Sequence, residues 1–147
     1  MSKEEYSKIL ELTPVCCVDL IVKHENKVLL VFRENSPAKN YWFLPGGRIF
    51  KNEILTEAVL RKAKEELGIE VKILKQLGAY DAIFKESYFK NINSGTHTIG
   101  IVFIVEPAKD FKITLDSTHS KFKWVDKIED SFHPYVKKVL KDSGVFN

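Results

Sequence analysis

Hydrophobic positions along the chain form two kinds of pattern, continuous apolar runs and apolar residues spaced three or four apart. The runs Val15–Val22 and Lys27–Arg33 are rich in aliphatic residues, and Glu25-Asn26 between them is typical of a turn. We expect both runs to be buried strands. Further extended segments are predicted at Val71–Leu77, Ala79–Phe89, Ile99–Val105 and Phe122–Val125.

Three segments have helical spacing. The clearest is Glu53–Leu67, whose apolar residues recur at intervals of three and four and which is followed by Gly68 at the C-cap position. Ser2 can cap a first helix that ends before Thr13-Pro14, and a closing helix is predicted over Pro134–Lys141. Strands and helices mix without repeats or linkers. The pattern therefore predicts one α+β domain over residues 1–147, a mixed sheet flanked by helices.

Composition narrows the classes of partner. The 147 residues carry 23 basic and 20 acidic side chains, a net charge of +3 that does not demand a nucleic acid. The charged N-terminus lacks the apolar core of a signal peptide, and no stretch approaches the ~18 apolar residues of a membrane span. The adjacent Cys16 and Cys17 fit neither a disulfide framework nor a metal site, and we expect two small core residues in a reducing cytoplasm.

The chemistry is concentrated between Gly46 and Ile69. A glycine turn, Gly46-Gly47, precedes the central helix, and Glu65 and Glu66 stand near the end of that helix. Negative charge there opposes the helix dipole, and a divalent cation such as Mg²⁺ or Mn²⁺ would relieve the repulsion. The alternative is a solvated helix with surface glutamates. The glycines and an arginine at fixed spacing make that alternative less favourable.

Arginine is scarce in this chain. Only Arg33, Arg48 and Arg61 occur among the 23 basic residues. The planar guanidinium donates two parallel hydrogen bonds to a phosphate, which lysine cannot do. A surface ion pair is the alternative for each of them. Because all three stand near the glycine turn in the sequence, we favour phosphate contacts for Arg33 and Arg48, and for Arg61 an orienting contact to Glu65, four residues on.

This segment resembles the Nudix box, G-x5-E-x7-R-E-U-x-E-E-x-G-U, where U is a bulky aliphatic residue. The matching residues are Gly47, Glu53, Arg61, Glu65, Glu66, Gly68 and Ile69. Lys62 departs from it, since it replaces the first glutamate of the R-E-U-x-E-E run, which in many Nudix pyrophosphatases is a metal ligand or a base. The resemblance implies the Nudix fold, and Lys62 favours a single metal over a cluster.

Other segments are similar to one Nudix branch, the GDP-mannose mannosyl hydrolases. The similar segments are Pro14–Asp19, Leu29–Arg33, Tyr41–Arg48 and Thr118–Trp124. The likeness covers nearly the whole chain apart from the region of residues 80–93. That branch also lacks the usual first glutamate of the box, so Lys62 fits it better than it fits a pyrophosphatase.

The resemblance implies roles for individual residues. His119 is the expected general base, although without the resemblance a loop histidine beside a strand would be favoured. Arg33 and Arg48 are expected to grip the diphosphate and neutralise charge on the departing GDP.

The same resemblance implies a metal site. The carbonyl of Gly46 and the carboxylate of Glu66 match the ligands of the branch, and Glu65 matches only the wider Nudix pattern. A third ligand of the branch, a glutamine, falls at Thr118, whose shorter side chain binds through water or not at all.

Two further residues have a substrate-binding and a structural interpretation. Asp19 lies in an apolar strand and needs a partner, which is either the sugar or a substrate-binding arginine, or else a structural hydrogen bond. Tyr6 matches an aromatic residue that holds guanine, contributed across a dimer, or it lies on the core face of the first helix.

The leading hypothesis is a magnesium-dependent hydrolase that cleaves GDP-mannose, or a related GDP-hexose, to GDP and free sugar by attack of water at the anomeric carbon. The alternatives are a pyrophosphohydrolase that attacks phosphorus in a nucleotide sugar or similar substrate, and a non-catalytic nucleotide-binding module. The expected partner is a nucleotide-sugar substrate, with no nucleic acid and no membrane, and the resemblance implies a homodimer. The identity of the sugar is not specified by the sequence.

Overall fold

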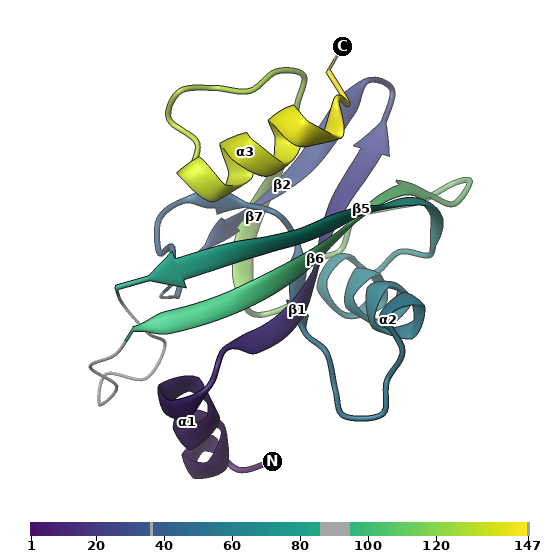
Figure 1. The fold of residues 1–147 in the computed structure, drawn as a ribbon. Helices are drawn as coiled ribbons and strands as arrows, with labels where there is room; N and C mark the ends of the chain where they lie inside the picture. The colour runs from purple at the N-terminus through teal and green to yellow at the C-terminus, as the bar shows by residue number, and fades with distance from the viewer. Residues whose placement is uncertain (36, 86–94, 147) are drawn as a thin grey trace.

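The computed structural model describes residues 1–35, 37–85 and 95–146. Figure 1 shows the order of its elements along the chain. The helices are α1 (Lys3–Leu12), α2 (Leu55–Leu67) and α3 (Pro134–Ser143). The strands are β1 (Val15–His24), β2 (Lys27–Arg33), β3 (Trp42–Phe43), β4 (Gly46–Arg48), β5 (Val71–Phe84), β6 (Thr96–Pro107) and β7 (His119–Val125).

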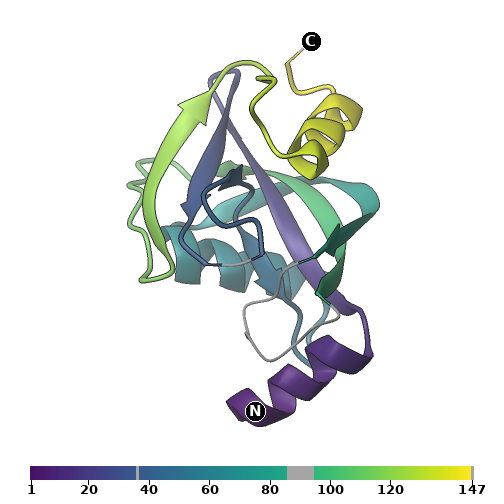
Figure 2. The same ribbon diagram turned by 90° about the vertical axis from the view of Figure 1, so that its left-hand side faces the viewer.

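Strand β1 belongs to two diverging sets of strands. Along most of its length it pairs in parallel with β6, which in turn pairs antiparallel with β5. The first half of β1 also pairs with β4, whereas its last two residues pair with β2. Strand β2 continues the sheet to β3 and β7, and Figure 2 shows β7 beside β2. This divergence leaves room near the middle of β1 for a cavity.

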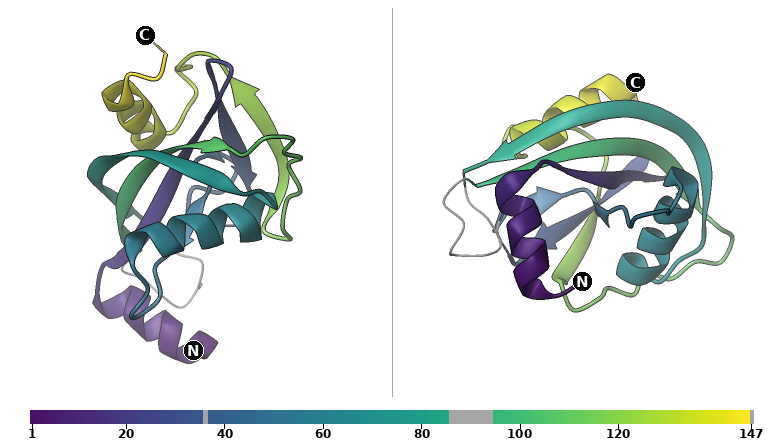
Figure 3. Two further views of the ribbon diagram at one scale, coloured as in Figure 1. Left: turned by 90° about the vertical axis from the view of Figure 1, so that its right-hand side faces the viewer. Right: turned by 60° about the horizontal axis from the view of Figure 1, so that its bottom comes forward.

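Helices α2 and α3 cover different sides of the strands, as both views of Figure 3 show. The side chains of α2 pack with Leu20 and Phe103 in one apolar cluster. Those of α3 pack with Ile21 and Val102, the next positions along β1 and β6. Alternate residues of a strand face opposite sides of a sheet, so both faces of these strands are buried. Helix α1 lies apart, at the bottom of Figure 1.

The α+β architecture with helices flanking a mixed sheet is confirmed. Strand β2 has the predicted bounds, and Ser2 is the N-cap of α1, where it forms a capping box with Glu5. The central helix begins at Leu55 rather than Glu53, because the Glu53 carboxylate accepts the backbone N–H of Phe50 ahead of the helix. In the described part of the chain, no helix is long and apolar enough to cross a membrane.

Strand predictions were least accurate in the second half of the chain. The predicted break between Leu77 and Ala79 is wrong, because β5 runs through Gly78 and absorbs two register shifts as bulges. The predicted end of that segment, residues 86–89, lies outside the described residues. Strand β7 begins at His119, three residues earlier than predicted, because His119 pairs with Arg33 of β2.

The two cysteines are free. Cys16 is exposed and therefore is not the core residue that we predicted. Cys17 is partly buried and lines the cavity described below. The difference follows from their adjacency, because neighbouring side chains of a strand point to opposite faces.

Candidate active site

A cavity of about 480 Å³ opens where the strands paired with β1 diverge. All the predicted site residues except Glu65 line it: Tyr6, Asp19, Arg33, Gly46, Arg48, Glu66, Thr118 and His119. They come from α1, β1, β2, β4, α2, the first residue of β7 and the loop before it. The sequence segments singled out for their chemistry therefore meet in one place.

Gly46 and Gly47 form a strand, not the turn that we predicted. Both belong to β4, and Gly46 lies opposite Asp19 of β1. A Cβ atom at Gly46 would lie 2.2 Å from the backbone oxygen of Val18, and one at Gly47 would lie 2.6 Å from Cε of Lys62. Gly46 is needed for space, because its close neighbour is a backbone atom, whereas at Gly47 the close neighbour is the flexible end of a side chain. Neither glycine has a positive φ.

That space brings helix α2 against β4. Glu66, whose side chain is 5% exposed, accepts the backbone N–H of Gly46 through Oε1 at 3.2 Å. Its Oε2 lies 2.8 Å from Nζ of Lys62, which also lies 3.5 Å from Glu65. The lysine that departs from the Nudix box thus pairs with Glu66, the predicted metal ligand within the box. The net charge around Glu66 is correspondingly less negative.

Arg61 connects the box to β4 without lining the cavity. Its Nε lies 2.7 Å from Glu53, its Nη1 lies 3.2 Å from Glu65, and its Nη2 donates to the backbone oxygen of Arg48 at 2.9 Å. These contacts lower the pKa of Glu53, chiefly through the hydrogen bond from Arg61. Arg61 therefore orients the carboxylates, and Glu65 turns toward it and away from the cavity.

Arg33 and His119 are opposite each other on β2 and β7. Arg33 uses Nε to donate to the backbone oxygen of Pro37 at 2.6 Å, which fixes its plane. Burial lowers the pKa of this arginine, while the charges of Glu66 and Asp19 raise it. A partly buried guanidinium that lines the cavity and interacts with the charges of Glu66 and Asp19 is well placed to receive an anionic ligand.

Arg48 lies on the α1 side of the cavity. Its guanidinium carbon is 4.7 Å from the ring centroid of Tyr6 and 5.3 Å from that of Phe50. Tyr6 also packs with Leu10 and Val15, so both interpretations of Tyr6 apply: it belongs to the core face of α1, and it lines the cavity.

His119 is held by a short loop that ends where β7 begins. Its side chain is 6% exposed, and Nδ1 lies 3.2 Å from Oδ1 of Asp116 and 4.0 Å from Oε1 of Glu66. The hydroxyl of Thr118, predicted to be near a metal, donates to the same Asp116 oxygen at 2.7 Å. A ligand role for Thr118 remains a prediction, and the structure gives its hydroxyl a different partner.

Asp19 has a buried partner that the sequence did not reveal. The hydroxyl of Tyr135, on α3, donates to its Oδ2. Burial raises the pKa of Asp19 to about 6, against the opposing effect of the Tyr135 hydrogen bond. Gly100 on β6 makes the pair possible, because a Cβ there would lie 2.1 Å from the Tyr135 hydroxyl.

Three functional candidates escaped the sequence analysis. Asp116 could have been noticed as a carboxylate three residues before His119. Tyr135 is separated from Asp19 by 116 residues, and nothing local links them. Thr96 also lines the cavity, and its buried hydroxyl has no hydrogen-bond partner in the described part of the chain.

The donor groups of the cavity suit one divalent cation that also binds the substrate. No group of three or more His, Cys, Asp or Glu side chains suited to a metal occurs among residues 1–35, 37–85 and 95–146. A carboxylate offers about four lone-pair directions, and Gly46 and Lys62 use only two of those on Glu66. Mg²⁺ is commonly held by one or two carboxylates together with substrate phosphates. The residues therefore fit a single cation shared with a substrate.

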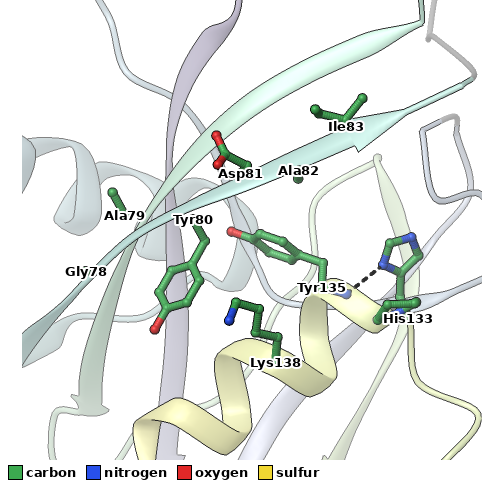
Figure 4. A pocket seen from close by; sticks show the side chains of 10 residues that line it. Gly78, Ala79, Tyr80, Asp81, Ala82, Ile83, His133, Tyr135 and Lys138 are labelled. Atoms are coloured by element: carbon green, nitrogen blue, oxygen red, sulfur yellow. Dashed lines mark hydrogen bonds between the residues drawn. The ribbon is translucent and has the colours of Figure 1, made fainter.

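A second cavity, of about 580 Å³, lies between β5 and the start of α3. Figure 4 shows Tyr80, Asp81 and Lys138 around it, with Tyr135 at its inner side. The backbone N–H of Tyr135 donates to Nδ1 of His133 at 3.1 Å, which caps α3. Tyr135 lines both cavities and thus forms part of the wall between them.

Comparisons with known proteins agree with this geometry. Residues 13–138 match the model of the NUDIX domain. The chain is 40% identical over 137 residues to the low-salt glycan biosynthesis protein Agl8 of Haloferax volcanii, which covers 93% of this chain and 86% of that protein. It is 38% identical over 97 residues to the ADP-ribose pyrophosphatase of Methanocaldococcus jannaschii, covering 66% of this chain and 53% of that protein.

Solved structures share the fold. A MutT NUDIX hydrolase from Burkholderia pseudomallei superimposes with a TM-score of 0.73 at 22% identity, over 88% of this chain and 98% of that one. A MutT protein from Methanosarcina mazei Go1 gives 0.70 at 26% identity, over 87% and 91% of the two chains. A glycine-bounded helix with an arginine and paired glutamates, the surrounding fold and the match over most of the chain lead to one conclusion: this protein belongs to the Nudix hydrolase family.

Proposed function

We propose that this Nudix hydrolase cleaves a nucleoside diphosphate sugar, GDP-mannose or a related GDP-hexose, to GDP and free sugar. In the reaction, water attacks the anomeric carbon and inverts its configuration. The observation that carries the proposal is the position of His119, which is buried in the cavity beside Glu66 and Asp116. A histidine there can accept a proton from water near neutral pH.

Lys62 supports attack at carbon over attack at phosphorus. Its ammonium group lies 2.8 Å from Glu66, in the place where the standard box has another carboxylate. Positive charge at this point discourages a second cation and leaves Glu66 less able to act as a base. It also favours an anion in the cavity. The proton acceptor is then best supplied from the β7 side, by His119.

The chain's own residues account for the steps of the reaction. His119 accepts one proton from water as the water oxygen bonds to the anomeric carbon. The bond from that carbon to the diphosphate oxygen breaks, and its electron pair leaves with GDP. Arg33 and Arg48, both lining the cavity, neutralise the charge that gathers on the leaving diphosphate. Asp19 lies within the same cavity and can accept a hydrogen bond from a sugar hydroxyl.

Nudix hydrolases generally use divalent cations, and Mg²⁺, with Mn²⁺ as a substitute, is the cation that we propose. Glu66 and the Gly46 carbonyl would hold it, with a weaker contribution from Glu65 or Thr118. When bound, it would neutralise part of the diphosphate charge. Because Glu65 pairs with Arg61 and Thr118 with Asp116, we give Glu66 the main role.

The relatives support two substrate classes. The name of the Haloferax volcanii relative, a glycan biosynthesis protein, is compatible with a nucleotide-sugar substrate. The name of the Methanocaldococcus jannaschii relative supports the second candidate, pyrophosphate hydrolysis by attack at phosphorus. A non-catalytic nucleotide-binding module is the third. We also propose a homodimer, which sedimentation analysis tests directly.

One experiment separates these candidates. The protein is incubated with Mg²⁺ and a panel of nucleotide sugars in ¹⁸O-labelled water, and products are read by phosphorus NMR and mass spectrometry. The proposal predicts GDP and free sugar, with the label in the sugar. Label in a phosphate, with GMP and sugar phosphate as products, would identify a pyrophosphohydrolase. Saturable binding without turnover would identify a binding module.

A further inference from the structure

The polar neighbours of His119 lie on one edge of its ring. Nδ1 is 3.2 Å from Oδ1 of Asp116, 3.0 Å from Oγ1 of Thr118 and 4.0 Å from Oε1 of Glu66. In the described residues, Nε2 has no hydrogen-bond partner. The two ring nitrogens therefore experience different surroundings, one among oxygen atoms and the other left for a ligand or water.

Counting hydrogens on this edge identifies the protonated nitrogen. The Thr118 hydroxyl has one hydrogen, which it donates to Asp116 at 2.7 Å. Its oxygen then faces Nδ1 as an acceptor, and an ionised Asp116 can only accept. If Nδ1 carried no hydrogen, its lone pair would face the Asp116 oxygen at 3.2 Å with no hydrogen between the two acceptors. A hydrogen on Nδ1 satisfies all three groups.

Asp116 is held in place by hydrogen bonds from its backbone and its side chain. Its backbone N–H donates to the backbone oxygen of Glu66 at 3.3 Å, which ties the loop to the end of α2. Its Oδ1 accepts the backbone N–H of Thr118 at 3.1 Å and the Thr118 hydroxyl at 2.7 Å. Asp116 thus presents a fixed acceptor oxygen to the histidine ring.

We propose that Asp116 is a positioning residue that holds His119 as the Nδ1–H tautomer, so that the Nε2 lone pair is free to accept a proton from water. Which nitrogen of a histidine carries hydrogen is set by the hydrogen bond that the other makes, so a fixed carboxylate decides the tautomer. Thr118 assists by bridging the two side chains. Proton transfer from water to Nε2 rests on the proposed function, whereas the choice of tautomer does not.

The test is long-range ¹H–¹⁵N NMR of the full chain, which distinguishes the two neutral tautomers of histidine by their nitrogen shifts. Wild-type protein, in chelator and at a pH where His119 is neutral, should show the Nδ1–H form. Asp116→Ala should shift it to the Nε2–H form. Asp116→Asn keeps an acceptor oxygen and should retain Nδ1–H. Asp126→Ala, an exposed aspartate after β7, is the matched control.

Kinetics give a second readout of positioning. Asp116→Ala should lower kcat by about 10–100-fold, as is usual for residues that orient a functional side chain, with little change in KM. Thr118→Val preserves Asp116 and should give a smaller loss in the same direction. It also provides the test if Asp116→Ala fails to fold.

The outcomes distinguish this inference from the proposed function. An Nε2–H tautomer in wild type, or a tautomer that neither Asp116→Ala nor Thr118→Val changes, would overturn the role of Asp116 whatever the enzyme cleaves. A tautomer that responds as stated, in a protein that does not cleave nucleotide sugars, supports Asp116 as the positioning residue and rejects the proposed function.

Discussion

The polar groups on the two sides of the cavity differ in how fully the protein itself supplies their hydrogen-bond and ion-pair partners. One side, which we call the box end, is formed by β4, α2 and the residues just before α2. There the lining residues Lys62 and Glu66, and also Glu53 and Arg61, which do not line the cavity, each have an ion-pair partner at 2.8 Å or less. On the side that we call the floor, formed by Asp19, Thr96 and Tyr135, desolvation raises the pKa of the Asp19 carboxyl group, and the Thr96 hydroxyl has no hydrogen-bond partner within the described residues. The box end is satisfied by the protein alone, whereas the floor is left incomplete.

This contrast indicates where binding energy is available. Unpartnered or desolvated polar groups lower the stability of the free protein, and a ligand that completes their hydrogen bonds regains that free energy. The box end should therefore tolerate change poorly in both stability and activity. Substitutions on the floor should stabilise the protein while weakening its activity.

The largest expected effect concerns His119, at the junction of the two sides. His119→Ala should lower kcat by about 10²–10⁴, the usual range for the loss of a general base. Lys62→Glu restores the standard box and should neither rescue this loss nor change the bond cleaved. Kinetics and product analysis of both variants and of the double variant provide the check. Wild-type kcat in His119→Ala would contradict attack at carbon assisted by this histidine.

Asp19→Asn should sharpen the contrast by stabilising the protein. The folded-state pKa of about 6 exceeds the ordinary value of 3.8, so the folded state binds more protons between these values. Stability of the wild type therefore falls as pH rises from about 4 to 6, by on the order of 3 kcal/mol. Asp19→Asn should lack this loss, and its kcat/KM should decrease.

Urea unfolding in chelator across pH measures this difference. Asp126→Asn, which changes an exposed aspartate, is the control. Equal stability curves for wild type and Asp19→Asn from pH 4 to pH 8 would show that the Asp19 carboxyl group is not destabilised by burial.

Arg61→Ala should destabilise the protein, in contrast to the stabilisation expected for Asp19→Asn. It removes hydrogen bonds to Glu53, to Glu65 and to the Arg48 backbone, and hydrogen bonds to charged groups contribute about 1.5–3 kcal/mol each before solvent screening. We expect a loss of about 2 kcal/mol, reduced from the sum because the site is partly solvated. Chemical denaturation measures it, and Arg61→Lys should recover only part. An unchanged denaturation midpoint would show that the Arg61 contacts of the box end do not contribute to stability.

Thr96→Val tests the floor with the smallest change. Removing a buried hydroxyl without a partner should stabilise the free protein by about 1 kcal/mol, and substrate affinity should fall. Thr96→Ser retains the hydroxyl and should keep that affinity. The exposed Thr114, in the loop beside Gly68, provides the control Thr114→Val. A loss of stability in Thr96→Val would mean that the hydroxyl is already satisfied in the free protein.

The sequence predicted what is local. The spacing from Gly47 to Ile69 was enough to predict helix α2 and the presence of Glu66 in the candidate site, because helical periodicity and box spacing lie within one segment. It was not enough to predict that Gly46 and Gly47 are a strand, since their pairing partners, Asp19 and Val18, lie some distance back in the chain.

Contacts between segments far apart in the chain could not be predicted from the sequence. The Tyr135 hydroxyl reaches Asp19 from the last helix, and Gly100 allows that approach from a third segment. The resemblance to one Nudix branch singled out His119, yet Asp116, its neighbour in the loop, was missed because a single carboxylate in a charged sequence carries no periodic signal.

The close packing of Lys62 over Gly47 also links position 47 to the charge inside the cavity. A Cβ at position 47 would lie 2.6 Å from Cε and 2.8 Å from Nζ of Lys62, so a side chain there would displace the flexible lysine stem. The same Nζ lies 2.8 Å from Oε2 of Glu66. A substitution at position 47 should therefore alter the charge around Glu66 without replacing any ionisable residue.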